Sequence, residues 1–91
     1  MKKNTLDNRI IKKAQDRIDF TSRCIMRIMH NEELSDTSKS SIVYNYYQQT
    51  EDYISGLADG YITMADTFNE DVYDKLRGYE RLMINVRWSN K

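Results

Sequence analysis

Hydrophobic residues recur every three or four positions in three long segments of the chain, which is the period of an amphipathic helix. The first stripe consists of Leu6, Ile10, Ile11, Ala14, Ile18, Thr21, Cys24, Ile25, Ile28 and Met29. The second consists of Val43, Tyr46, Tyr47, Tyr53, Ile54, Leu57, Ala58, Tyr61, Met64 and Ala65. The third consists of Val72, Leu76, Tyr79, Met83 and Val86. At about 100° per residue, each set falls on one side of a helix.

Polar residues at the ends of these stripes set the boundaries of the predicted helices. The segment 31–38 breaks the period, and its Ser35, Asp36 and Thr37 are residue types that cap helix N-termini. Thr67 and Glu70 have the spacing of a capping box. The sequence therefore predicts helices at about 5–30, 38–65 and 69–87. Because short connections join them, we expect an all-α, up-down-up three-helix bundle that forms one domain over residues 1–91.

The composition supports a helical chain. The 91 residues include no proline and only three glycines. The single cysteine, Cys24, excludes an internal disulfide and fits a reducing compartment. No apolar run approaches the length of a membrane span, and the first residues do not form a secretory signal. We therefore expect a cytoplasmic protein without a membrane partner.

Charge is unevenly distributed along the chain, although 14 basic and 14 acidic residues give a net charge of zero. Residues 1–31 carry +5, residues 32–74 carry −9 and residues 75–91 carry +4. The chain is thus neither a uniformly basic nucleic-acid binder nor a uniformly acidic nucleic-acid mimic. Two interpretations of the acidic middle stay open. It either pairs internally with the basic helices or forms a surface for a basic partner protein.

Two sets of residues are candidates for contacting such a partner. The acidic face is predicted to consist of Glu51, Asp52, Asp59, Asp66, Glu70, Asp71 and Asp74. The aromatic patch is predicted to consist of Tyr44, Tyr73, Ile84 and Trp88. Aromatic side chains of this kind are enriched at the energetic centres of protein interfaces. Tyr44 points away from the hydrophobic stripe, so we expect it to be the most exposed tyrosine of the second helix.

The sequence contains no arrangement of residues that indicates catalysis or cofactor binding. His30 and the nearby acids have no metal-ligand spacing, and Cys24 lies on an apolar stripe without a base beside it. We therefore expect a non-enzymatic protein without a metal, cofactor or small-molecule ligand. Gly56 and Gly60 have a spacing that either admits a closely packed helix or locally weakens their own helix.

A nucleic-acid-binding regulator is the alternative interpretation. It would use the basic face of the first helix, which consists of Arg9, Lys12, Lys13, Arg23 and Arg27. Asp16 and Asp19 interrupt this face, and the acidic middle segment repels phosphate. A homodimer through the first or third helix is a further option, because a chain this short buries only about 60–65% of its unfolded surface.

Three stretches, 34–47, 53–61 and 69–76, are short, proline-free and rich in Tyr, Asp and Asn. In its short length and in this composition, the chain resembles the small all-helical accessory proteins of bacteriophages and mobile elements, including anti-CRISPR and other anti-defence inhibitors. The resemblance implies a protein that binds and blocks or redirects a host protein in the host cytoplasm. It implies no catalytic residues. The expected function is therefore a non-enzymatic protein-binding inhibitor or adaptor acting on a host protein with a basic surface.

Overall fold

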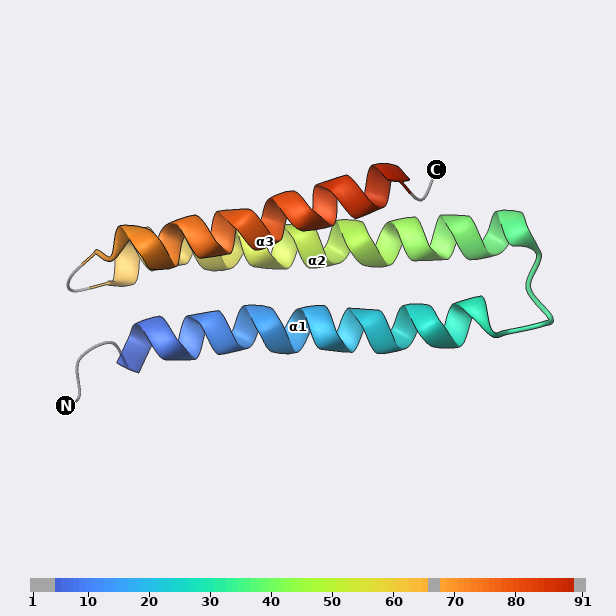
Figure 1. The fold of residues 1–91 in the computed structure, drawn as a ribbon, viewed down its shortest axis with the longest axis horizontal. Coiled ribbons are helices and arrows are strands. Elements are labelled where there is room, and N and C mark those ends of the chain that lie inside the picture. Colours follow the sequence, from blue (N-terminus) through green and yellow to red (C-terminus); the bar gives the residue numbers. More distant parts are fainter. Residues whose placement is uncertain (1–4, 66–67, 90–91) are drawn as a thin grey trace.

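The computed structural model describes residues 5–65 and 68–89, with side chains of the third helix described as far as Val86. Its elements are α1 (Thr5–Met29), α2 (Asp36–Met64) and α3 (Glu70–Ser89). Consecutive helices run in opposite directions (Figure 1), and the elongated bundle measures 51 × 22 × 15 Å. The predicted all-α, up-down-up architecture is confirmed. Each helix boundary lies within two residues of its predicted position.

Side-chain caps define the helix ends. The N-cap of α2 is Ser35, whose side chain accepts a hydrogen bond from the Ser38 amide at 3.1 Å. Before α3, the side chain of Asn69 accepts one from the Asp71 amide at 2.9 Å, which satisfies a free donor of the first turn. At the connection between α1 and α2, Lys39 Nζ donates to the carbonyl of Met29, the last residue of α1, at 3.0 Å. Thr67, the first residue of the predicted capping box, lies outside the described residues.

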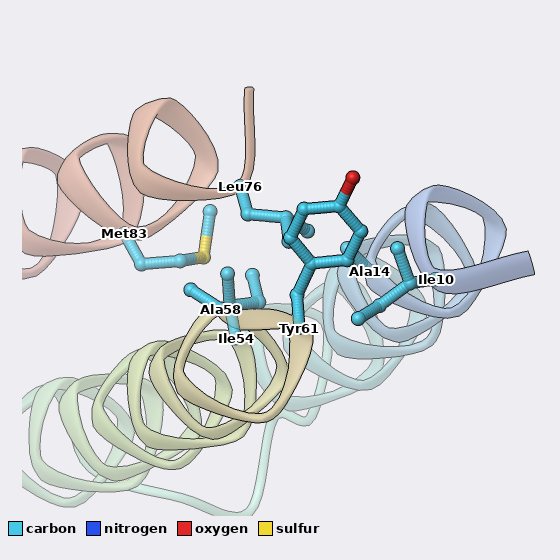
Figure 2. Packing of buried hydrophobic residues seen from close by; sticks show 7 residues of the cluster. All are labelled: Ile10, Ala14, Ile54, Ala58, Tyr61, Leu76 and Met83. Atoms are coloured by element: carbon cyan, nitrogen blue, oxygen red, sulfur yellow. The ribbon is translucent and has the colours of Figure 1, made fainter. Parts of the chain in front are cut away.

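The main hydrophobic core joins all three helices near the connection between α2 and α3. Tyr61 lies at its centre, fully buried between residues of α1 and Leu76 of α3 (Figure 2). The buried members of this cluster are Ile10, Ala14, Ile54, Ala58, Tyr61, Leu76 and Met83. All of them belong to the predicted stripes. The hydrophobic period therefore identified the residues that hold the bundle together.

A smaller buried region joins only α1 and α2, farther along the hairpin. It contains Cys24 and Val43, together with a hydrogen bond between the buried hydroxyls of Thr21 and Thr50. Thr50 Oγ1 also approaches the carbonyl of Tyr46 at 2.8 Å. Because a hydroxyl has one hydrogen, Thr50 donates to that carbonyl and Thr21 donates to Thr50.

Three residues of the predicted stripes are exposed. Met29 and Met64 are the last residues of α1 and α2 and are 53% and 63% exposed. Tyr53 is 38% exposed and lies against Arg17, whose guanidinium carbon is 5.2 Å from the centre of its ring. The prediction that Tyr44 is the most exposed tyrosine of this helix is wrong, because Tyr44 is half-buried.

Candidate functional site

The acidic residues of the predicted face have different environments in the fold. Asp52, Asp59, Glu70, Asp71 and Asp74 are exposed, whereas Glu51 is half-buried. Asp66 lies outside the described residues. Asp71 lines a cavity of about 360 Å³ between α1 and α3, together with Asp7, Lys12 and Lys75. Charges of both signs surround Asp71, so it does not belong to a uniformly acidic surface.

Arg77 of α3 neutralises part of the acidic face. Its Nη2 donates to Asp59 at 2.8 Å, and its Nη1 donates to the half-buried Glu80 at 2.7 Å. The third donor, Nε, bonds to the hydroxyl of Tyr73 at 2.8 Å. The hydrogen bond to Glu80 is the main cause that raises the pKa of Arg77 above its ordinary value. Asp59 is therefore paired within the chain and not free for a partner protein. A count of charges along the sequence does not reveal this pair.

The predicted aromatic patch is divided along the bundle. Tyr73 is half-buried, packs against the core and lies near the start of α3. Ile84 is half-buried and lies 11 residues farther along α3, a distance of about 16 Å in a helix. The side chain of Trp88 lies outside the described residues. Tyr73 and Ile84 therefore belong to different parts of the surface.

Phe68 is an aromatic residue that the sequence analysis did not select. It is 50% exposed, and its ring centre lies 5.7 Å from that of Tyr61 and 5.7 Å from that of Tyr73. Ile62, which is 52% exposed, lies in the last turn of α2 and thus at the same end of the bundle. The only sequence signal for Phe68 was its place beside a predicted helix start, because a residue in a connection follows no helical period.

Acidic residues accompany these exposed apolar side chains. We use the term α2–α3 end surface for the set Asp59, Ile62, Phe68, Glu70 and Asp74. Glu70 and Asp74 are four residues apart and so lie on the same side of α3. Among the residues that the structure describes, neither has an ion-pair partner. The α2–α3 end surface thus combines an aromatic anchor with two carboxylates, Glu70 and Asp74, that form no ion pair with a described residue, whereas Asp59 is paired with Arg77.

A buried hydrogen-bond network fixes this end of the bundle. The hydroxyl of Tyr61 donates to Asp7 Oδ1 at 2.8 Å and accepts from the amide of Asn69 at 3.0 Å. Burial is the main cause that raises the pKa of Tyr61 above its ordinary value of 10.0. The network links the start of α1, the end of α2 and the residue before α3. Phe68, whose ring packs against that of Tyr61 at a tilt of 43°, is therefore held against a residue that hydrogen bonds fix in place.

The basic face of α1 points to solvent. Arg9, Lys12, Lys13, Arg23 and Arg27 are all exposed. Lys12 forms an ion pair with Asp16 at 3.3 Å, in which both side chains are largely exposed. Such a pair contributes little to stability. All five basic residues of the predicted nucleic-acid-binding face are therefore exposed on α1.

The remaining candidate chemistry is limited. Cys24 is buried, and His30 is exposed just beyond α1. Among the described residues, no three His, Cys, Asp or Glu side chains are placed to hold a metal ion together. None of the described helices has the length and apolarity needed to cross a bilayer. Comparison with protein-family models, curated proteins and solved structures found no match to this chain.

Proposed function

We propose that this protein is a non-enzymatic protein-binding inhibitor or adaptor that docks its α2–α3 end surface on a basic surface of another protein. The observation that carries the proposal is the environment of Phe68. Its ring is half exposed but lies against both Tyr61 and Tyr73, so little conformational freedom is lost when a partner covers it.

The surroundings of Phe68 supply orientation. Glu70, two residues after Phe68, and Asp74, one turn farther along α3, carry negative charge at this end of the bundle. Such charges speed the encounter with a basic surface and fix the orientation of the complex. A well-supported aromatic side chain with polar groups around it is a common arrangement at the centre of protein interfaces. The resemblance to phage accessory proteins adds a host protein as the partner class. Where that partner handles nucleic acid, the carboxylates compete with phosphate for its basic residues.

The test is affinity capture from a bacterial host lysate with the complete chain as bait. We expect Phe68→Ala and the pair Glu70→Gln with Asp74→Lys each to reduce capture of a specific protein by at least about tenfold. Leu82→Ala is the matched control for Phe68, because Leu82 is 47% exposed elsewhere on α3. Asp19→Lys, on exposed α1, is the control for charge reversal. Capture that is unchanged in all four variants would exclude the α2–α3 end surface as the binding site.

The second candidate function is nucleic-acid binding through the basic face of α1. The observation in its favour is that all five of its Arg and Lys side chains are exposed. Such binding weakens steeply between about 50 and 200 mM salt. A gel shift with duplex and single-stranded probes at low salt tests it, with Arg23→Gln and Arg27→Gln as variants. Absence of a shift at about 10 μM protein excludes this candidate.

A further inference from the structure

A groove runs between α1 and α2, and all of its lining residues come from these two helices. It encloses about 280 Å³. Leu6, Leu57 and Met64 make it apolar, whereas Arg9 and Lys13 form a basic rim on the α1 side. Gly56 and Gly60 also line it, one turn apart on α2. The α2–α3 end surface includes none of these residues, so the groove is a separate feature.

The two glycines are not required by the packing of this chain. Apart from the adjoining residues and the backbone of α2 itself, a Cβ atom added at Gly56 or Gly60 would meet no atom of the described residues within 4 Å. Glycine in a helix interior is destabilising relative to alanine. Two glycines one turn apart allow another helix to approach the backbone closely, and no helix of this chain does so here. The space above them is therefore suited to a helix from another molecule.

Arg17 lies one turn after Lys13 on α1 and so continues the row of basic residues along this side of the helix. Its guanidinium lies between the rings of Phe20 and Tyr53, at 5.5 and 5.2 Å from their centres. Both rings are exposed. Arg17 Nε is buried and makes no hydrogen bond to any residue that the structure describes. Among the described residues Arg17 also has no ion-pair partner, so the charge of its guanidinium favours a carboxylate partner.

A carboxylate in a suitable position is present on α2 of the chain itself. Asp52 is exposed and, within the described part of the chain, has no ion-pair partner. It adjoins Tyr53, the residue that Arg17 contacts, so Asp52 and Arg17 lie at nearly the same height along the hairpin. Asp52 lies two turns before Asp59, which bonds to Arg77 of α3, so it is on the side of α2 that faces away from α1. The groove thus has a basic rim on α1 and an acidic residue on the far side of α2.

We propose that the occupant of this groove is α2 of a second copy of the chain, in a dimer whose two-fold axis is parallel to α2. A parallel two-fold axis keeps each residue at the same height and exchanges the two rims. Arg17 of each copy then faces Asp52 of the other, and Gly56 and Gly60 of the two copies meet at the contact. An antiparallel pairing would place the two basic rims beside each other. The charge pattern therefore favours the parallel arrangement. The contact is formed by α2, whereas the sequence had indicated α1 or α3 as the dimer interface.

Sedimentation velocity of the complete chain, from about 1 to 300 μM, tests the dimer. We expect a reversible monomer–dimer equilibrium in this range. In Gly56→Leu with Gly60→Leu, the new side chains fill the groove, so this variant stays monomeric while its circular dichroism remains helical. Gly78→Leu is the matched control, because Gly78 is a helical glycine whose Cβ would also meet nothing within 4 Å. Its dimerisation remains unchanged.

A charge exchange tests the orientation. We expect Asp52→Arg to weaken dimerisation by at least about tenfold, and Asp52→Arg combined with Arg17→Glu to restore most of it. A chain that is monomeric at the highest concentration overturns the proposal. A dimer that persists in the double leucine variant also overturns it, because the contact then lies on another face. A dimer that is indifferent to Asp52→Arg overturns the parallel arrangement.

Discussion

The hydroxyl of Tyr61 donates a hydrogen bond to Asp7 Oδ1 at 2.8 Å, across 54 residues of sequence and inside the core. The Tyr61 side chain is fully buried and Asp7 is 7% exposed. The same hydroxyl oxygen accepts from the Asn69 amide at 3.0 Å. This hydroxyl of α2 therefore links α1 to the residue that precedes α3, at the end of the bundle that carries Phe68.

Tyr61→Phe is expected to lower the free energy of unfolding by about 1–3 kcal/mol, because it leaves a buried carboxylate oxygen and a backbone amide without their partner. Urea denaturation followed by circular dichroism measures this loss. Tyr79→Phe is the control. Its hydroxyl bonds to exposed Gln15 at 3.0 Å, where water can replace the contact, so a loss below about 0.5 kcal/mol is expected. Equal losses in the two variants would contradict the special role of Tyr61.

Stability is expected to fall in alkaline solution because of the same phenol. Burial, with a smaller effect of Asp7, raises the pKa of Tyr61 in the folded chain above 10.0. The unfolded chain therefore releases this proton first. The contribution is complete below pH 10 and is lost as the pH rises through the folded pKa, at up to about 1.4 kcal/mol per pH unit.

The measurement compares the original chain with Tyr61→Phe between about pH 8 and 11.5. The difference between their free energies of unfolding should be constant up to about pH 10 and should shrink above it, because the variant lacks the titrating group. A difference that stays constant over the whole range would show that this phenol does not couple folding to pH.

Thr21 and Thr50 are expected to be energetically coupled. Thr50→Val leaves the buried Thr21 hydroxyl without an acceptor and should cost about 1–3 kcal/mol. Thr21→Val should cost less, about 0.5–1 kcal/mol, because Thr50 still donates to the Tyr46 carbonyl. The double variant should be more stable than Thr50→Val alone. Additive losses in urea denaturation would contradict the coupling, and a larger loss for Thr21→Val than for Thr50→Val would contradict the assigned donor direction.

Arg77→Lys is expected to lower stability by about 1 kcal/mol, because an ammonium group cannot bond to Asp59, Glu80 and Tyr73 in the geometry of the guanidinium. Asp59 is 67% exposed, so solvent screens its share. The loss should be smaller at about 1 M salt. Arg81→Lys, at an exposed position of α3, is the control and should have no measurable effect. If both variants lose the same free energy of unfolding at every salt concentration, the three hydrogen bonds of the Arg77 guanidinium do not contribute to stability in this way.

Hydrophobic periodicity was sufficient to predict the three helices and the main core. The stripes contained Ile10, Ile54 and Leu76 because side chains that face the same core must recur at the helical period. The start of α2 was also predictable, since Ser35 belongs to the group of residues named as caps. Before α3 the side chain that bonds to the first turn is that of Asn69, which was not named as a cap. What the periodicity could not supply was the relative rotation of the helices, which decides the polar pairs.

Asp7, Thr50 and Arg77 illustrate this limit. Each is polar and forms a contact with a residue distant in sequence, as Asp7 does with Tyr61 and Arg77 with Asp59. The position of Asp7, three residues before Ile10 and seven before Ala14, placed it on the inner side of the helix, but its charge favoured solvent. A buried carboxylate becomes predictable only when its donor is known to lie opposite.

The length of α3 gives the two ends of the molecule different rates of local opening. In the register that pairs Asp59 with Arg77, Ser89 lies level with about Tyr47, so the first turns of α2 extend beyond α3. There the hairpin is only two helices thick, and Cys24 and Val43 are buried outside the main core. Amide hydrogens around Val43 should therefore exchange with deuterium sooner than those around Ala58. A partner protein would therefore meet a rigid end of the bundle at Phe68 and a more flexible end at the connection between α1 and α2.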